Sequence, residues 1–269
     1  MHAEYIERAF AEIGARFKVE EAQRGKLSRQ IPYSVDISAD RRGQFFLLRA
    51  QVATMPVLDV QVLQKSKPER HLLLLVKDEQ IAEKNRFLCG YDEREWFVAA
   101  TPGGASSIAA AKEALKPEIV AQRQAAVGLT RNQRLQRRNK AFIRQGEWFF
   151  LPEPGLVVPE TRIHRHEPIF RSGGKPHYVE ELYRAGGELV FVNRQYPLGL
   201  TRGQLEEVLS RRKELRRQYF VQRRRGMTVY GRGKVTHRDH HTVVLHEWHL
   251  IVMNEEYKSP ARQNLAFLD

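Results

Sequence analysis

The chain has 269 residues and a hydrophobic content of 42%, enough for one large domain or two ordinary ones, which excludes a wholly disordered protein. It carries 45 Lys and Arg against 32 Asp and Glu, so the formal net charge of +13 favours a polyanion or an anionic surface as partner. The single cysteine, Cys89, excludes an internal disulfide framework and a Cys-rich zinc module.

The first residues and the longest apolar runs bear on the location of the protein. Residues 1–18 carry Glu4, Glu7 and Glu12 among their apolar side chains, so they lack the apolar core of a signal peptide. The most apolar runs, 72–76 and 97–100, are far too short to cross a bilayer. Since one cysteine also suits a reducing compartment, the sequence predicts a cytoplasmic protein with no membrane partner.

In chain order, the pattern predicts first a helix and then a series of strands. The helix is indicated by Ile6, Phe10, Ile13 and Phe17, which recur at helical spacing. Apolar and polar residues then alternate over 33–37 and 58–62, as in half-buried strands. Short apolar runs predict further strands at 45–48, 71–76, 86–89 and 96–100. We therefore expect a largely antiparallel sheet in the first half.

The segment 89–96 between the last two of these strands predicts a hairpin turn. Asp92, Glu93 and Glu95 lie beside Arg94 there, so we expect an ordinary solvated turn, with acidic metal ligands as the alternative. Cys89, at the strand end, is expected to be a small buried hydrophobe.

Three helices are predicted in the middle of the chain. Ser106 or Ser107 can cap the first, and Pro117 opens a second that stops near Gly128. Thr130 and Gln133 form a capping box for a third helix, which we expect to run through Ile143 because no helix breaker follows.

The last part of the chain again mixes strands with a helix. Strands are predicted at 148–151, 162–170, 188–193, 228–235 and 242–254, and a helix at 205–218 follows the capping box of Thr201 and Gln204. The sequence thus predicts an α+β protein with mainly antiparallel sheets and a central helical, Arg-rich segment. We place an N-terminal α+β domain at 1–116, a basic helical connector at 117–145 and a C-terminal α+β domain at 146–269.

Two blocks concentrate the positive charge. From Ile119 to Gln145 seven basic residues occur without an acidic one. On the predicted helix they form a cationic ridge that can follow a phosphate backbone. The candidate contacts in this block are Arg131, Arg134, Arg137, Arg138, Lys140 and Arg144.

The second block adds aromatic residues to the basic ones. Tyr219, Phe220 and Tyr230 lie among arginines, and we expect Tyr230 in particular to stack on an unpaired base. The candidate contacts here are Arg211, Arg212, Arg216, Arg217, Arg223, Arg224, Arg225, Tyr230, Arg232 and Lys234. For the first block the alternative is a solvated face, or a ridge that covers the acidic surface of a partner protein. For the second block the alternative is that the aromatic residues belong to the core.

Histidines crowd the segment 237–249, which holds five of them. The combination of imidazole and carboxylate groups can bind a divalent metal ion, which can activate water against a phosphodiester. Our candidate ligands are His237, Asp239, His241 and His249. More distant contributors can come from His164, His166 and His177. The spacing matches no metal motif, so a purely structural role is the alternative.

Charge clustering favours nucleic acid as the ligand. We expect a nucleic-acid-binding protein that prefers RNA or single strands and uses its Arg-rich helical and loop surfaces. Two alternatives stay open. One is a metal-dependent phosphodiesterase or nuclease that uses the His-rich segment, and the other is an assembly or adaptor protein that docks on an acidic protein partner.

Overall fold

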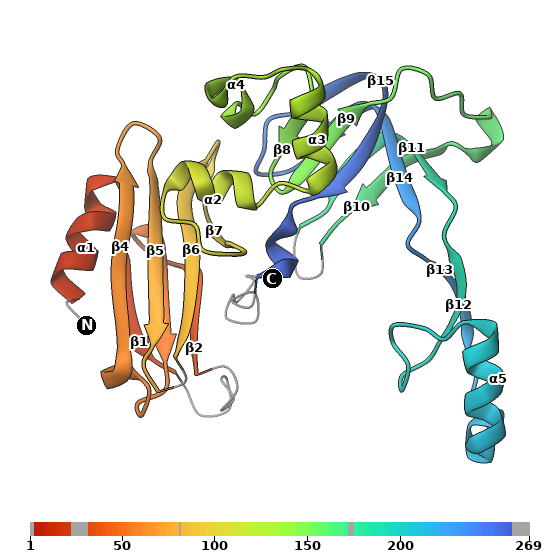
Figure 1. Ribbon diagram of the computed structural model, residues 1–269, viewed down its shortest axis with the longest axis horizontal. Helices are drawn as coiled ribbons and strands as arrows, with labels where there is room; N and C mark the ends of the chain where they lie inside the picture. The colour runs from red at the N-terminus through yellow and green to blue at the C-terminus, as the bar shows by residue number, and fades with distance from the viewer. Residues whose placement is uncertain (1–2, 23–31, 81, 172–174, 260–269) are drawn as a thin grey trace.

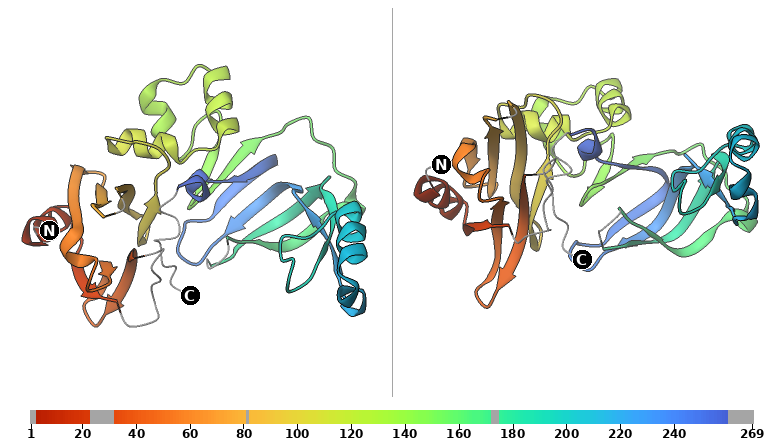
Figure 2. Two further views of the ribbon diagram at one scale, coloured as in Figure 1. Left: turned by 60° about the horizontal axis from the view of Figure 1, so that its bottom comes forward. Right: turned by 90° about the horizontal axis from the view of Figure 1, so that it is seen from below.

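The computed structural model describes residues 3–22, 32–80, 82–171 and 175–259. Figure 1 shows two β-rich halves joined by a helical segment, and the views in Figure 2 show the same separation. All strand pairs within the sheets are antiparallel except β1 with β3. The prediction of an α+β fold with mainly antiparallel sheets is therefore confirmed.

The N-terminal half packs one helix and two sheets around a common core. Helix α1 (Ala3–Glu12) precedes a three-stranded sheet of order β1-β3-β2, whose strands are β1 (Phe17–Glu21), β2 (Tyr33–Asp40) and β3 (Gly43–Ala50). After the short 3-10 turn η1 (Met55–Val57) comes a sheet of consecutive strands, β4 (Leu58–Ser66), β5 (His71–Asp78), β6 (Glu83–Asp92) and β7 (Glu95–Ala100). Every strand predicted in this half is present.

The first helix is shorter than the sequence pattern predicted. It ends at Glu12, and Phe17 lies in β1 instead of on the helix. Phe17 is still buried, because its ring stacks on that of Phe10 at 4.8 Å and both belong to the core between α1 and the two sheets. The spacing of the aromatic residues thus correctly predicted that Phe10 and Phe17 are buried together, but it wrongly placed Phe17 on the helix.

The central segment contains α2 (Ile108–Ala114), α3 (Glu118–Ala126) and α4 (Arg131–Leu135). The Ser107 hydroxyl caps α2 by accepting from the amide of Ala110 at 3.1 Å, and the Thr130 capping box is present. The prediction that this third helix reaches Ile143 is wrong. The Asn139 side chain accepts from the amide of Ala141 at 2.9 Å, forming a turn that sends Phe142 into the core.

The C-terminal half is a six-stranded sheet of order β10-β11-β14-β15-β9-β8. Its strands are β8 (Ile143–Gln145), β9 (Trp148–Pro152), β10 (His164–Ile169), β11 (His177–Ala185), β14 (Thr228–Thr236) and β15 (Val243–Met253). The 3-10 turns η2 (Glu160–Arg162) and η4 (Glu255–Lys258) flank it in sequence. The sequence pattern missed β8 and β11.

A two-stranded extension leaves the end of this sheet, as Figure 1 shows on the right. It consists of β12 (Glu188–Val192), α5 (Arg202–Arg211), the 3-10 turn η3 (Lys213–Arg217) and β13 (Val221–Arg225). The Thr201 capping box of α5 is present, but the single helix predicted at 205–218 is divided at Arg212, whose φ of −120° and ψ of 79° are not helical. No helix of the described residues is long and apolar enough to span a bilayer.

Candidate functional site

We call residues 186–227 the arm, because they project from the C-terminal sheet (Figure 1). The arm has a small core of its own, in which Val190 is 2% exposed and Leu215 is fully buried. The rings of Tyr196 and Phe220 stack beside each other, with centroids 6.4 Å apart. This core gives the charged side chains of the arm a folded support.

The arm is strongly basic. It holds ten Lys and Arg against four Asp and Glu, so its formal charge is 10 − 4 = +6 out of a total of +13. The acidic residues are already paired in this structure: Glu207 with Arg211 at 2.8 Å, Glu214 with Arg212 at 3.0 Å and Glu188 with Arg225 at 2.6 Å. Glu206 lies 3.3 Å from Arg202.

Other cations of the arm keep their charge uncompensated. Arg216 donates to the carbonyl of Leu209 at 3.1 Å, and Arg224 donates to the carbonyl of Gly187 at 3.2 Å, but a neutral carbonyl does not cancel the charge of a guanidinium. Among the described residues, six exposed cations of the arm have no carboxylate within ion-pair distance. They are Arg194, Lys213, Arg216, Arg217, Arg223 and Arg224.

The three aromatic candidates of the second block differ in how exposed their side chains are. The side chain of Tyr219 is 83% exposed, between the basic residues of η3 and β13. Tyr230 instead lies on β14, half-buried against the core, with its ring 5.9 Å from that of Tyr183. Phe220 packs on Tyr196. Tyr219 is therefore the aromatic side chain of this block that is available to a ligand.

Two further candidates of the second block lie on the C-terminal sheet, outside the arm. Arg232 pairs with Glu181 at 2.5 Å, and its guanidinium lies over the ring of Trp248. Lys234 is exposed on β14, and its backbone amide donates to the carboxylate of Glu180 at 2.7 Å.

Two arginines of the first basic block form ion pairs with acidic residues of the same chain. Arg137 pairs with both Asp92 and Glu93, and Arg144 lies 3.4 Å from Asp92. Burial lowers the pKa of Arg137 to about 10 and also lowers the pKa of Arg144. Both cations are thus occupied by carboxylates in this structure.

The remaining basic residues of this block divide into two groups. Arg134 is half-buried, and its side chain donates to the carbonyl of Leu129 at 3.2 Å. Only Arg131, Arg138 and Lys140 of the six candidates are exposed. Because the helix ends at Leu135, these six side chains do not form one helical ridge.

The acidic partners lie at the tip of the β6–β7 hairpin. The hairpin itself is confirmed, but the expectation of solvated charges is wrong, since the Asp92 and Glu93 side chains are only 15% and 11% exposed. Glu93 also accepts a hydrogen bond from the backbone amide of His241 at 2.5 Å. The hairpin tip of the N-terminal half is therefore bound to the segment that carries the histidines.

Three histidines come together beside this contact. His177 begins β11, whereas His237 and His240 lie in the loop between β14 and β15. Their rings stack, with centroids 4.1 Å apart for His177 and His237 and 4.6 Å for His237 and His240. One nitrogen from each ring lies within 4.8 Å of the others. We call these three residues the histidine cluster.

Burial keeps the histidine cluster uncharged. It lowers the pKa of His177 to about 3 and that of His240 to about 4, and it also lowers the pKa of His237. His177 is 1% exposed, and neither of its ring nitrogens has a hydrogen-bond partner among the described residues. Neutral imidazoles retain the lone pairs that a metal ion requires.

The predicted metal ligands are distributed differently from our expectation. Of the four, only His237 belongs to the cluster. Asp239 pairs with Lys175 at 2.7 Å, and His241 is exposed. His249 is buried on β15 with its Nδ1 2.8 Å from the carbonyl of Glu247. His240 adjoins a predicted ligand, and His177 is one of the three histidines expected as distant contributors to this segment.

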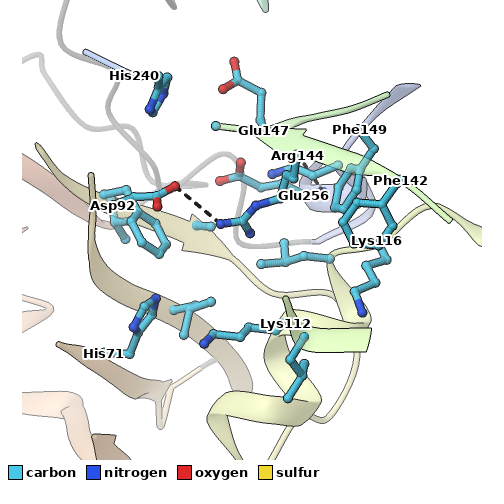
Figure 3. Close-up of a pocket in the computed structure, with 18 of the residues that line it drawn as sticks. His71, Asp92, Lys112, Lys116, Phe142, Arg144, Glu147, Phe149, His240 and Glu256 are labelled. Carbon is cyan, nitrogen blue, oxygen red and sulfur yellow. Dashed lines mark hydrogen bonds and ion pairs between the residues drawn. The ribbon is translucent and has the colours of Figure 1, made fainter. Parts of the chain in front are cut away.

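A cavity of about 240 Å³ lies between the two halves, close to the hairpin. Figure 3 shows charged side chains of both signs around it, among them Lys112, Arg144, Glu147 and Glu256, with His240 at its edge. Lys116, also in the wall, is held by Glu113 at 2.7 Å and by the carbonyl of Arg134 at 2.8 Å. Lys116 therefore connects α2 with α4 in this wall of the cavity.

Comparisons with known proteins identify no relative: no family model, no curated protein and no solved structure matches the chain.

Proposed function

We propose that the protein binds nucleic acid through the arm, with single-stranded or looped segments preferred over plain duplex. The observation that carries the proposal is the group of six exposed cations on a projecting, folded support. None of them has a carboxylate partner within the part of the chain that the structure describes. Guanidinium groups donate paired hydrogen bonds to phosphate oxygens, and clustered cations release condensed counterions when they bind a phosphate backbone.

Tyr219 supports the preference for unpaired bases. Its ring is exposed between cationic segments, so a base can stack on it while neighbouring arginines contact the flanking phosphates. A stacked duplex hides the faces of its bases, whereas single strands and loops present them. An acidic protein partner would use the same charges but would not depend on an exposed aromatic ring in this way.

The proposed setting is the cytoplasm. Cys89 is fully buried, and burial raises the pKa of its thiol, so the side chain behaves as an inert hydrophobe that needs no oxidising compartment.

Salt-dependent binding tests this proposal. The variant Arg216→Gln/Arg217→Gln/Arg223→Gln removes three uncompensated charges from the arm. We expect weaker binding to oligonucleotides of every sequence. The slope of log affinity against log salt should fall by about 2–3, because each phosphate contact contributes about 0.7 for single strands and 0.9 for duplex.

The matched control removes three exposed arginines from the other end of the molecule. Arg8, Arg41 and Arg42 lie on α1 and at the β2–β3 turn, so their replacement by Gln changes the net charge equally. If both triple variants lose the same affinity and slope, binding follows total charge and the arm is not the interface. An acidic protein that competes more strongly than RNA at equal charge would favour the adaptor alternative.

A further inference from the structure

The histidine cluster contains buried polar atoms that lack partners. Both ring nitrogens of His177 are unsatisfied among the described residues, although the side chain is 1% exposed. Buried polar groups almost always have a hydrogen-bond partner, so an exception calls for a bound atom or ion. Nitrogen atoms of two other imidazoles lie within 4.8 Å of a His177 nitrogen, and neutral imidazoles offer one lone pair and one N–H each.

The Nε2 atoms of His177 and His240 both lie close to Gly146. A Cβ atom on Gly146 would lie 2.8 Å from Nε2 of His240 and 3.4 Å from Nε2 of His177. Gly146 has a φ of +56°, and the absence of a Cβ atom lets the two imidazole rings lie against its backbone. The two Nε2 atoms therefore face a common region that any other residue at position 146 would fill.

Neighbouring groups lie beside the Nδ1 atoms of two rings. Nδ1 of His240 is 3.5 Å from the carboxylate of Glu93 but has no hydrogen-bond partner among the described residues. A small shift of this ring would form the hydrogen bond by which a carboxylate supports a metal-bound histidine. Nδ1 of His237 accepts from the amide of Asp239 at 3.1 Å, and the ring also bonds to the backbone of Lys175. If this amide exchanged its hydrogen bond to Nδ1 for one to another acceptor, Nδ1 of His237 would be free to bind a metal ion.

We propose that His177, His237 and His240 bind one divalent transition-metal ion of the zinc class. Three imidazoles suit Zn²⁺ and its neighbours, whereas Mg²⁺ and Ca²⁺ prefer oxygen ligands. Bonds of about 2.0–2.1 Å in a tetrahedron hold nitrogens about 3.3 Å apart. The nitrogens now lie up to 4.8 Å apart and the rings are stacked, with interplanar angles of 19° to 27°. Binding therefore requires the rings to move closer and to turn, so that their nitrogens point at one ion.

The proposed ligand set leaves one coordination position unassigned. No carboxylate of the described residues joins the three histidines within the same distance limit. Three protein ligands with a fourth position for water are characteristic of catalytic zinc sites, whereas structural sites usually have four protein ligands. Because His240 also lines the cavity, a ligand in the cavity can approach this side of the cluster.

Cobalt titration tests the proposal directly. Protein produced without a histidine tag is stripped with a chelator and titrated with Co²⁺, which takes tetrahedral zinc sites and gives them visible absorption. We expect one equivalent to bind, with a spectrum of tetrahedral type that Zn²⁺ abolishes by displacement. Zn²⁺ should also raise the melting temperature, because a ligand that binds the folded state stabilises it.

Single substitutions assign the ligands. His177→Gln and His240→Gln should each lower Co²⁺ affinity at least 100-fold, whereas His241→Gln should leave it within about 2-fold because His241 is exposed beside the cluster. Circular dichroism confirms that each variant is folded. His240→Gln serves as the second test if the buried His177 variant does not fold.

Two results would overturn the proposal. One is wild-type protein that binds no Co²⁺ or Zn²⁺ at micromolar concentration and shows no thermal shift. The other is an equal loss of affinity in His241→Gln, which would place the ion on the exposed loop. Neither result concerns the arm. The metal-site proposal and the nucleic-acid proposal can therefore be disproved independently of each other.

Discussion

The carboxylate of Glu93 accepts a hydrogen bond from the backbone amide of His241, 148 residues further along the chain, at 2.5 Å. The same carboxylate pairs with Arg137 and faces His240. One side chain at the tip of a hairpin thus joins the N-terminal half, the central segment and the histidine loop. We expect it to hold these three parts in register.

Replacement of Glu93 tests this connection. Glu93→Ala should lower the stability by about 2 kcal/mol. It leaves the half-buried Arg137 with fewer partners and removes the bond that Glu93 accepts from the His241 amide. The melting temperature should fall by about 4–8 °C at that cost. Glu93→Gln keeps an acceptor oxygen but not the charge, so its loss should be intermediate. Glu79→Ala, exposed at the β5–β6 turn, is the control and should change little. Equal melting temperatures for wild type and Glu93→Ala would contradict this role.

Gly146 offers a second test, because another glycine matches its backbone. Gly146 and Gly128 have φ values of +56° and +64°, but a Cβ at 128 meets nothing within 4 Å. Substitution by Ala should cost about 1–2 kcal/mol of backbone strain at either position. Gly146→Ala should cost more than Gly128→Ala, and it alone should weaken Co²⁺ binding, because its methyl group meets His240. Thermal melts and cobalt titrations of both variants compare the two effects.

Glu147 predicts a pH dependence of stability. Its carboxylate lines the cavity, and burial, with the charge of Glu256, raises its pKa above the ordinary value of 4.5. Since the folded state holds this proton more tightly, stability falls as the pH rises from the ordinary pKa through the raised one. Glu147→Gln should therefore raise the melting temperature at pH 7.5, and the gain should fade towards pH 4. Glu7→Gln, exposed on α1, should show no such trend.

Tyr219 provides the test of strand preference. Tyr219→Ala should weaken binding to single-stranded oligonucleotides by about 1–3 kcal/mol, the usual contribution of one base stack, and should affect duplex much less. Its stability should stay unchanged because the ring is 83% exposed. Tyr5→Ala, 52% exposed on α1, is the matched control. Competition binding at constant salt measures the preference, and an unaltered preference would leave recognition to electrostatics alone.

Local patterns in the sequence determined most of the secondary structure. The alternating pattern of β2 and the apolar runs of β5 to β7 predicted these strands. The helix starts were predicted by the capping residues Ser107, Thr130 and Thr201. All of these signals depend on contacts between residues close together in the chain. The sequence pattern did not predict strand β11, because its pairing with β14 shifts register between Val179 and Glu181. That irregularity places the buried Val179 and Leu182 three residues apart, and an alternating pattern does not detect such a spacing.

The sequence by itself determined where the charges and histidines are concentrated, because composition along the chain is independent of folding. Only the tertiary structure decided which of them are available. Arg137 and Arg144 meet Asp92 across about fifty residues of chain, whereas Arg217 and Arg223 meet no carboxylate among the described residues. His177 joins His237 and His240 because β11 and β14 pair side by side in the sheet. Sequence spacing carries no information on such contacts, since strand pairing and burial, not chain distance, bring these side chains together.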